Sequence, residues 1–282
     1  MIKMRSETVV LETLQRWAED NERIRGMVLT SSRVIPGSTI DFLSDYDIEL
    51  YVADLAPFMA GDEWLEFLGP IMVRWPYKPR STMDPDWITR LVLFQDGVRV
   101  DFQITANPEV PADAYANGGR ILVDKDQLFG YLEEPTYTKY LVKKPTHQQY
   151  EELVHEFWWD AIYVPKYLWR GELPFAKYML DHTLRHCFLH PVIEWYIGSL
   201  TDWIANPGIW GRRFKYYLDA ELWWQLEGTY AGADLEENWA AFFTMLDLFS
   251  RLSRDVGSFL GLKYPRKLEE DVREYCMWIR NQ

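Results

Sequence analysis

The sequence is poor in cysteine and has no long apolar run. Its 282 residues include only two cysteines, Cys187 and Cys276, too few for a disulfide framework, which predicts a reduced, cytoplasmic protein. No segment approaches the ~20 consecutive apolar residues that cross a membrane. Residues 1–20 are interrupted by charges and lack the apolar stretch of a secretory signal. We therefore expect no association with a membrane.

Basic residues are also scarce relative to acidic ones. There are 30 lysines and arginines against 43 aspartates and glutamates, which gives a net charge of -13. Non-specific nucleic-acid binding needs a basic surface, so nucleic acid is not an expected partner. An acidic surface instead favours cationic small molecules, or metal ions that carry a phosphate substrate. The G-x-x-x-x-G-K-[ST] phosphate loop and the G-x-S-x-G elbow are both missing, which disfavours P-loop kinases and α/β-hydrolases.

The first half of the chain mixes helix and strand patterns. Apolar residues at helical spacing predict a helix over residues 6–20. Alternation predicts a strand over 46–52, and a turn at Gln95-Asp96-Gly97 predicts a hairpin of strands 91–94 and 98–104. Further short elements are expected at 27–29, 62–69 and 71–73.

After residue 145 helical periodicity dominates. Ten of the 14 tryptophans lie from Trp158 onward, which places a large aromatic core in this half. Helices are expected at 146–170, 172–197, 219–230, 235–262 and 266–281. The sequence thus predicts an α+β protein with an N-terminal domain, residues 1–144, built on a mixed sheet with flanking helices. A C-terminal helical bundle domain, residues 145–282, would follow it.

Acidic residues gather on one face of the strand predicted over 46–52. Asp45, Asp47 and Glu49 alternate with apolar residues, so a strand projects all three to one side. Carboxylates this close repel each other unless a cation lies between them. Mg²⁺ suits such a place, because it takes oxygen ligands, usually one or two carboxylates plus substrate phosphates. Asp101, between apolar neighbours of the later strand, joins the cluster if the two strands are adjacent.

A solvated strand edge, whose charges discourage aggregation, is the alternative interpretation of an isolated D-x-D. The preceding Ser31-Ser32 turn, the spacing and the separate Asp101 favour the metal site.

These residues resemble the pattern of the nucleotidyltransferase superfamily, which is Gly-Ser, a spacer, D-x-D or D-x-E, and a later acid. The matching segments here are Ser31-Ser32-Arg33, Asp45-Tyr46-Asp47-Ile48 and Val100-Asp101. More narrowly, the chain is similar to the bacterial aminoglycoside 6-adenylyltransferases. The similarity continues in order along nearly the whole chain, through Asp62-Glu63-Trp64-Leu65, Leu122-Val123-Asp124-Lys125-Asp126, Lys144-Pro145-Thr146, Glu156-Phe157-Trp158, Tyr163-Val164-Pro165-Lys166, Phe175-Ala176, Glu221-Leu222-Trp223, Thr229-Tyr230 and Tyr264-Pro265.

The resemblance implies a nucleotidyltransferase-like first domain and a helical, substrate-binding second domain. It also implies an antibiotic-resistance enzyme that transfers AMP from ATP to a hydroxyl of a streptomycin-like aminoglycoside, with Mg²⁺ as cofactor and pyrophosphate released. By position, Ser31, Ser32 and Arg33 would bind the triphosphate. Ser31 stands where these families usually have glycine, and its side chain restricts the backbone conformations that this position can adopt.

The register of the metal ligands is ambiguous within this resemblance. The streptomycin-type pattern selects Asp45 and Asp47, whereas the kanamycin-type pattern selects Asp47 and Glu49. Asp47 belongs to both. Asp101, the later acid, would bind metal or accept the proton of the substrate hydroxyl, so Asp47 and Asp101 are the expected catalytic residues.

The helical half offers further candidates. Lys166 and Arg170 lie four residues apart, on one helix face, and occupy family-like positions for triphosphate binding; a solvated basic stripe is the alternative. Glu156 could bind a cationic sugar or act as a base, or could be a structural acid. His182, His186 and His190 recur every four residues like a metal ladder, although packing is the favoured interpretation.

Two other functions stay open. The same fold could modify another small molecule or a protein, or it could be a non-catalytic nucleotide-binding module. The sequence identifies neither the aminoglycoside and its modified hydroxyl nor the oligomeric state.

Overall fold

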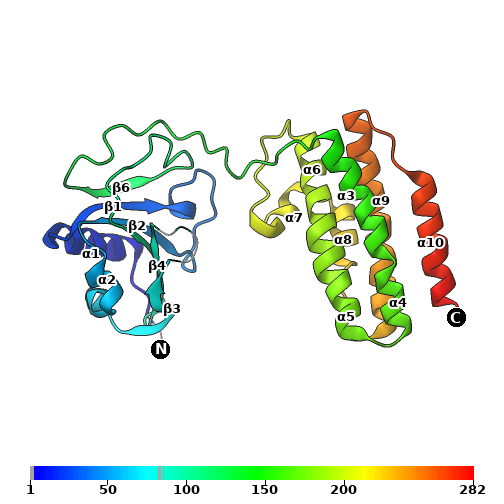
Figure 1. The fold of residues 1–282 in the computed structure, drawn as a ribbon, viewed down its shortest axis with the longest axis horizontal. Helices are drawn as coiled ribbons and strands as arrows, with labels where there is room; N and C mark the ends of the chain where they lie inside the picture. Colours follow the sequence, from blue (N-terminus) through cyan, green and yellow to red (C-terminus); the bar gives the residue numbers. More distant parts are fainter. Residues whose placement is uncertain (1–2, 82–83, 85) are drawn as a thin grey trace. The chain divides into compact units, whose positions relative to one another are not determined.

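The computed structural model describes residues 3–81, 84 and 86–282. The chain forms two compact units, one up to Lys139 and one from Tyr140 to Gln282. The sequence analysis had drawn the division after residue 144. Each unit has its own set of buried apolar side chains, and each is described separately below (Figure 1).

The first unit is built on a six-stranded sheet with strand order β3-β4-β5-β2-β1-β6. Strands β2 and β5 run parallel, and the other neighbours are antiparallel. The strands are β1 (Ile24–Thr30), β2 (Tyr46–Val52), β3 (Ile71–Arg80), β4 (Ile88–Phe94), β5 (Arg99–Thr105) and β6 (Arg120–Asp124). The helical segments are α1 (Glu7–Asp20), α2 (Ala56–Ala60) and the 3₁₀ turns η1 (Ser31–Arg33) and η2 (Glu63–Leu68).

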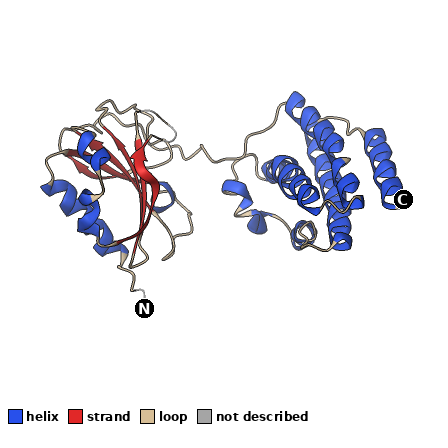
Figure 2. Ribbon diagram, turned by 60° about the horizontal axis from the view of Figure 1, so that its bottom comes forward, coloured by secondary structure: helices blue, strands red, loops and turns tan. Residues whose placement is uncertain are grey.

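One face of this sheet is apolar and carries the helices. Helix α1 begins because the Ser6 hydroxyl accepts a hydrogen bond from the Val9 amide, and it buries an apolar stripe against β1. Figure 2 shows α1 and α2 along one side of the sheet. Ile48 and Leu50 of β2 are fully buried on that side with Phe102 of β5. The predicted apolar face of β2 is therefore confirmed, and the acids of that strand must point the other way.

The second unit is helical, as expected. Its elements are α3 (His147–Ala161), α4 (Tyr163–Trp169), α5 (Leu173–Lys177), the π-helix η3 (Tyr178–Leu189), α6 (His190–Leu200), η4 (Ile209–Gly211), α7 (Phe214–Tyr217), α8 (Ala220–Glu227), α9 (Leu235–Leu260) and α10 (Arg266–Arg280). A capping box between Thr146 and Gln149 starts α3. The fold class predicted from the sequence, a mixed sheet followed by a helical domain, is confirmed.

The core of the helical unit is smaller than its tryptophan content indicates. Phe157 stacks on Phe249 with ring centroids 3.4 Å apart, and Trp158 packs edge-on against both. Yet Trp210 and Trp224 are more than two-thirds exposed. Within the described residues, no helix combines the length and the apolar character needed to span a membrane.

Candidate active site

The strand register brings the predicted acids together. Strand β1 is antiparallel to β2, so its last residue, Thr30, faces Asp47 near the start of β2. Strand β5 is parallel to β2, and Asp101 is the register partner of Asp47. The end of β1 leads directly into the Ser31–Arg33 turn. Three segments far apart in the sequence thus meet at one point on the polar face of the sheet.

Asp47 is the most perturbed acid of this group. Burial, together with the neighbouring carboxylates of Asp101 and Asp45, raises its pKa to about 6. A hydrogen bond from the Ser31 side chain and the charge of Arg99 act in the opposite direction. A carboxylate that is disfavoured by burial and by like charges is a typical feature of a functional site and a suitable place for a cation.

Arg99 is the basic partner of two acids of this cluster. Its Nε and Nη2 atoms donate to the two carboxylate oxygens of Asp101 at 2.9 and 2.7 Å. Its Nη1 atom lies 3.3 Å from a carboxylate oxygen of Asp45. The sequence analysis did not single out Arg99, although alternation along β5 puts it on the same face as Asp101.

Ser31 has a left-handed backbone. Its φ is 61°, a region in which a Cβ atom costs about 1–3 kcal/mol and which glycine enters freely. The conformation closes a tight turn, because the Ser31 carbonyl accepts hydrogen bonds from the amides of Val34 and Ile35 at 3.1 and 3.2 Å. This explains physically why glycine is usual here in the resembling families. Compared with glycine, serine adds a hydroxyl, which forms a hydrogen bond with the Asp47 carboxylate.

Substitution of Ser31 separates these two effects. We expect Ser31→Gly to unfold with a free energy about 1 kcal/mol higher than Ser31→Ala, because both lose the hydroxyl and only glycine relieves the backbone strain. Ser31→Ala keeps the strain and loses the hydroxyl, so it should lower stability by about 0.5–1.5 kcal/mol. Urea unfolding of both variants beside the wild type measures the difference. If glycine and alanine destabilised equally, the turn at Ser31 would not be strained.

Arg33 holds the segment that precedes β2. Its Nε and Nη2 atoms donate to the backbone carbonyls of Asp45 and Ser44 at 2.9 and 2.6 Å. Its Nη1 atom pairs with Glu7 at 2.8 Å, and the guanidinium lies 3.7 Å from the ring centre of Tyr46. The side chain is only 4% exposed. These contacts fix the backbone that carries Asp45. Binding of the triphosphate by Arg33 and by Ser32, which lies in the same turn, stays a prediction.

Glu49 has a different environment from Asp47. The Tyr115 hydroxyl donates to its carboxylate at 2.7 Å and lies 2.9 Å from the Tyr51 hydroxyl. Burial raises the pKa of Glu49, while the hydrogen bond from Tyr115 lowers it. Tyr115 comes from the loop between β5 and β6, and nothing in the sequence pattern pointed to it. Glu49 thus already has a protein partner, whereas Asp47 faces Asp101.

The donor set fits a divalent cation that is completed by substrate. Among the described residues, no three His, Cys, Asp or Glu side chains are placed to hold one ion. Asp47 and Asp101 form a close pair of hard oxygen donors beside Asp45. Two carboxylates plus phosphate oxygens is the usual environment of Mg²⁺ in phosphoryl-transfer enzymes, so the pair fits without a third protein ligand.

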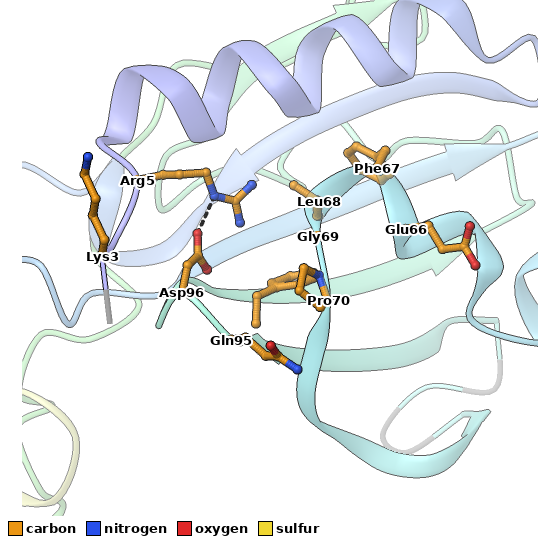
Figure 3. Close-up of a pocket in the computed structure, with 10 residues that line it drawn as sticks. Lys3, Arg5, Glu66, Phe67, Leu68, Gly69, Pro70, Gln95 and Asp96 are labelled. Atoms are coloured by element: carbon orange, nitrogen blue, oxygen red, sulfur yellow. Dashed lines mark hydrogen bonds and ion pairs between the residues drawn. The ribbon is translucent and has the colours of Figure 1, made fainter. Parts of the chain in front are cut away.

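A pocket of about 490 Å³ in this unit lies away from these acids. Figure 3 shows that its wall combines the N-terminal segment with the loop before β3 and the β4–β5 hairpin. Arg5 closes one side through an ion pair with Asp96 at 2.5 Å. None of the predicted site residues lines it. The chemistry of the acidic cluster, not the volume of this pocket, therefore defines the candidate active site.

The basic candidates of the helical unit are on or beside α4. The Lys166 ammonium lies 5.2 Å from the ring centre of Tyr163, and the Arg170 guanidinium 5.5 Å from that of Tyr167. In the described part of the chain neither forms an ion pair with a carboxylate. Both cations are thus available to an anion, and their role in nucleotide binding stays a prediction.

Glu156 lines a pocket of about 260 Å³ in the helical unit. Glu152, one helical turn earlier on α3, lines it as well, and Phe188 and Trp195 form an aromatic part of its wall. Negative charge beside aromatic rings is a suitable environment for an ammonium group. The structure thus puts Glu156 where a small cationic molecule could contact it.

The three histidines of the helical unit do not form a metal ladder. His182 and His186 lie in the π-helix η3 and His190 begins α6, and of the residues that the structure describes, no three His, Cys, Asp or Glu side chains are placed to hold a metal ion. The rings of His186 and His190 meet edge-to-face, 4.7 Å apart. Burial, together with the charges of His186 and Arg185, lowers the pKa of His190 to about 4. His190 is therefore a neutral core residue near pH 7.

The order of these segments matches one family along almost the full length. A sequence profile described as "Streptomycin adenylyltransferase" matches residues 4–279. The chain belongs to the streptomycin adenylyltransferase family. An aminoglycoside 6-adenylyltransferase from Bacillus subtilis is 31% identical over 98% of each chain, and one from Campylobacter jejuni is 30% identical over 97% of this chain and 96% of the relative.

A solved structure, that of an aminoglycoside 6-adenyltransferase from Bacillus subtilis, is 27% identical, with a TM-score of 0.48 over 99% of this chain and 100% of the other. Streptomycin adenylyltransferases are nucleotidyltransferases, and this chain is an enzyme of that class. The resemblance found from the sequence is thereby confirmed.

Proposed function

We propose that the enzyme transfers AMP from ATP to a hydroxyl of an aminoglycoside of the streptomycin type, with Mg²⁺ as cofactor. The observation that carries this proposal is the pairing of Asp47 with Asp101 beside the Ser31–Arg33 turn, in a chain of this family. Use of ATP agrees with the cytoplasmic location expected from the scarcity of cysteine. Such a modification would make the enzyme an antibiotic-resistance determinant.

The proposed reaction is one in-line displacement at phosphorus. The acceptor hydroxyl oxygen forms a bond to the α-phosphorus of ATP, and the bond from that phosphorus to the α,β-bridging oxygen breaks. Pyrophosphate leaves with the electron pair of that bond. Asp101 takes the proton of the hydroxyl, a role for which its carboxylate on the polar face of β5 is suited.

Asp47 and one neighbouring acid would hold the cation. When bound, Mg²⁺ supplies Lewis-acid stabilisation of the charge that develops on the phosphate oxygens. The Tyr115 hydrogen bond to Glu49 favours the register with Asp45 and Asp47 over the one with Asp47 and Glu49, because Glu49 would have to give up a buried partner. Asp101 would complete the donor set from the adjacent strand.

The phosphates would lie over the Ser31–Arg33 turn, because hydroxyl and backbone donors accommodate anions without bulk. Ser31 and Ser32 would donate hydrogen bonds to the phosphates. Arg33 would add positive charge while its guanidinium also holds the backbone carbonyls of Asp45 and Ser44. We assign Lys166 and Arg170, on or beside α4, to the binding of a phosphate anion. The predicted helical domain, residues 145–282, would bind the acceptor.

Glu156 would recognise an ammonium group of the acceptor in the pocket that it shares with Glu152. We expect Glu156→Gln to raise the KM for streptomycin about tenfold and to change kcat little, because a charge-assisted hydrogen bond contributes ~1.5–3 kcal/mol to binding. Glu151→Gln is the matched control, since Glu151 is an exposed neighbour on α3 that does not line the pocket. Equal KM values for both variants would remove Glu156 from the acceptor site.

Incubation with ATP labelled on the α-phosphate, Mg²⁺ and streptomycin tests the proposed function. Labelled AMP-streptomycin and free pyrophosphate are the expected products. If labelled AMP appeared on a different acceptor, the proposed AMP transfer would stand and the proposed acceptor would be wrong. Binding of ATP with no transfer to any acceptor, unaffected by Asp47→Asn, would indicate a non-catalytic nucleotide-binding protein instead.

A further inference from the structure

The acidic cluster formed by Asp45, Asp47 and Asp101 contains a cation of its own. Arg99 makes two hydrogen bonds to Asp101, at 2.9 and 2.7 Å, and its third nitrogen is 3.3 Å from Asp45. Its charge also reaches Asp47. A single guanidinium therefore contacts two of the three carboxylates that the proposed function assigns to metal and proton chemistry, and it offsets part of their negative charge.

This arrangement conflicts with the proposed role of Asp101. Both of its oxygens accept hydrogen bonds from Arg99, and a carboxylate held in this bidentate way is a poor ligand and a poor base. The cluster can serve catalysis only after the guanidinium has moved. Arg99 must then be either a permanent structural partner, which would inhibit the site, or a temporary one.

The exposure of the Arg99 side chain indicates that its pairing with Asp101 is temporary. The Arg99 side chain is 44% exposed, whereas that of Asp101 is 14% exposed. Ion pairs in which one member is this accessible to solvent contribute little to stability and exchange readily. A divalent cation brings twice the charge to the same oxygens and does not lose side-chain entropy on binding. It should therefore win the competition for Asp101.

We propose that Arg99 is the exchangeable counter-ion of this site: it contacts Asp101 and Asp45 where the divalent cation would bind, and the cation displaces it. The inference rests on the proposed function only in taking the acidic cluster as the cation site. The displaced guanidinium stays tethered to β5 and offers a fork of donors that matches a phosphate group.

Binding of Mn²⁺ without nucleotide or aminoglycoside tests the competition. Free Mn²⁺ is measured by electron paramagnetic resonance during titration of the full-length protein. Removal of the competitor in Arg99→Met should tighten Mn²⁺ binding about fivefold or more. Arg99→Lys keeps the charge but not the bidentate fork, so it should tighten binding by about twofold.

Arg25→Met is the matched control, because Arg25 forms a comparable exposed ion pair with Asp126 in the same unit. It should leave the Mn²⁺ affinity unchanged. An unchanged or weaker affinity in Arg99→Met would overturn the proposal. A wild-type affinity in Arg99→Lys would show that only through-space charge matters, which also overturns it.

A spectroscopic measurement on the wild type observes the displacement itself. The side-chain Nε–H resonance of Arg99 is assigned by its loss in Arg99→Lys. Saturating Mg²⁺ should move this resonance toward the position of solvent-exposed arginines and increase its exchange with water. A resonance unaffected by Mg²⁺ would mean that guanidinium and cation bind side by side, and the proposal would be wrong.

These outcomes separate the inference from the proposed function. If Mn²⁺ binds and responds to Arg99 as expected but no AMP is transferred, the counter-ion role stands and the proposed function fails. If neither the wild type nor Arg99→Met binds Mn²⁺, the counter-ion inference is refuted, whereas a cation site that the nucleotide phosphates complete, and with it the proposed function, still stands.

Discussion

Replacement of Asp47 by asparagine should abolish AMP transfer and at the same time make the ligand-free protein more stable. Asp47 is the acid shared by both possible metal registers, and a bound metal supplies several kcal/mol of transition-state stabilisation. Its loss should lower kcat by about 10³-fold or more. An assay with labelled ATP, Mg²⁺ and streptomycin measures this loss.

The gain in stability follows from the burial of the charge. The pKa of Asp47 is raised from 3.8 to about 6 in the folded protein, so the folded state holds this proton more tightly than the unfolded state. The protonated Asp47 therefore contributes its full stabilisation of the folded state below pH 3.8, and this contribution is lost as the pH rises through about 6. The loss amounts to about 3 kcal/mol at neutral pH, and Asp47→Asn avoids most of it.

Hydrogen exchange of the β2 and β5 amides in EDTA measures this difference. At pH 7.5 the asparagine variant should exchange more slowly than the wild type, and its advantage should shrink between pH 6 and 4. Asp113→Asn, at an exposed position in the same unit, should change neither activity nor stability. Faster exchange in Asp47→Asn at pH 7.5 would contradict the raised pKa.

The second large effect is expected at Asp101. Loss of general-base assistance in Asp101→Asn should lower kcat by about 10²–10⁴-fold. The value of kcat at saturating ATP and streptomycin measures this loss. A wild-type kcat in Asp101→Asn would assign the proton transfer to another group.

Glu49→Gln is the control that discriminates between the metal registers. The side chain lies on the same face as Asp47, and its carboxylate accepts a hydrogen bond from Tyr115. If Asp45 and Asp47 hold the metal, Glu49→Gln should lower kcat far less than Asp101→Asn does. A loss as large as that of Asp47→Asn would establish the register with Glu49.

Local patterns predicted the elements around the site well. Strand β2 was predicted with the bounds that it has, because polar and apolar residues alternate from Tyr46 to Leu50 and the apolar face continues to Val52. The β4–β5 hairpin was predicted from its Asp96-Gly97 turn, and the two strands do pair antiparallel. Such features depend on neighbours in the sequence, so periodicity and turn chemistry suffice to find them.

Non-local pairing was beyond the sequence. Asp47 and Asp101 are adjacent only because β2 and β5 run parallel, and no local signal specifies which strands of a mixed sheet become neighbours. The contact between Tyr115 and Glu49 depends on the path of a loop, which has no periodicity. The residues 172–197, predicted as one helix, do lie in one unbroken helical run, 173–200, made of α5, η3 and α6. Only the π-helical hydrogen bonding of η3 was not predicted, because it leaves no mark in the apolar pattern.

Arg99 was accessible to sequence reasoning but was overlooked. It stands two residues before Asp101 on a predicted strand, so both side chains had to share a face. Attention to negative charge alone hid the positive partner. A cluster of acids in one strand is therefore best examined together with the basic residues of every strand that could lie beside it.

The separate cores of the two units affect how this enzyme is studied by spectroscopy. Ten of the 14 tryptophans belong to the helical unit, whose buried side chains form a cluster of their own, whereas the acidic cluster belongs to the sheet unit. Intrinsic fluorescence during denaturation will therefore report chiefly on the half of the molecule without the acids. A dye or fluorine label in the sheet unit is required to observe how substrates, inhibitors or substitutions alter the half that carries the chemistry.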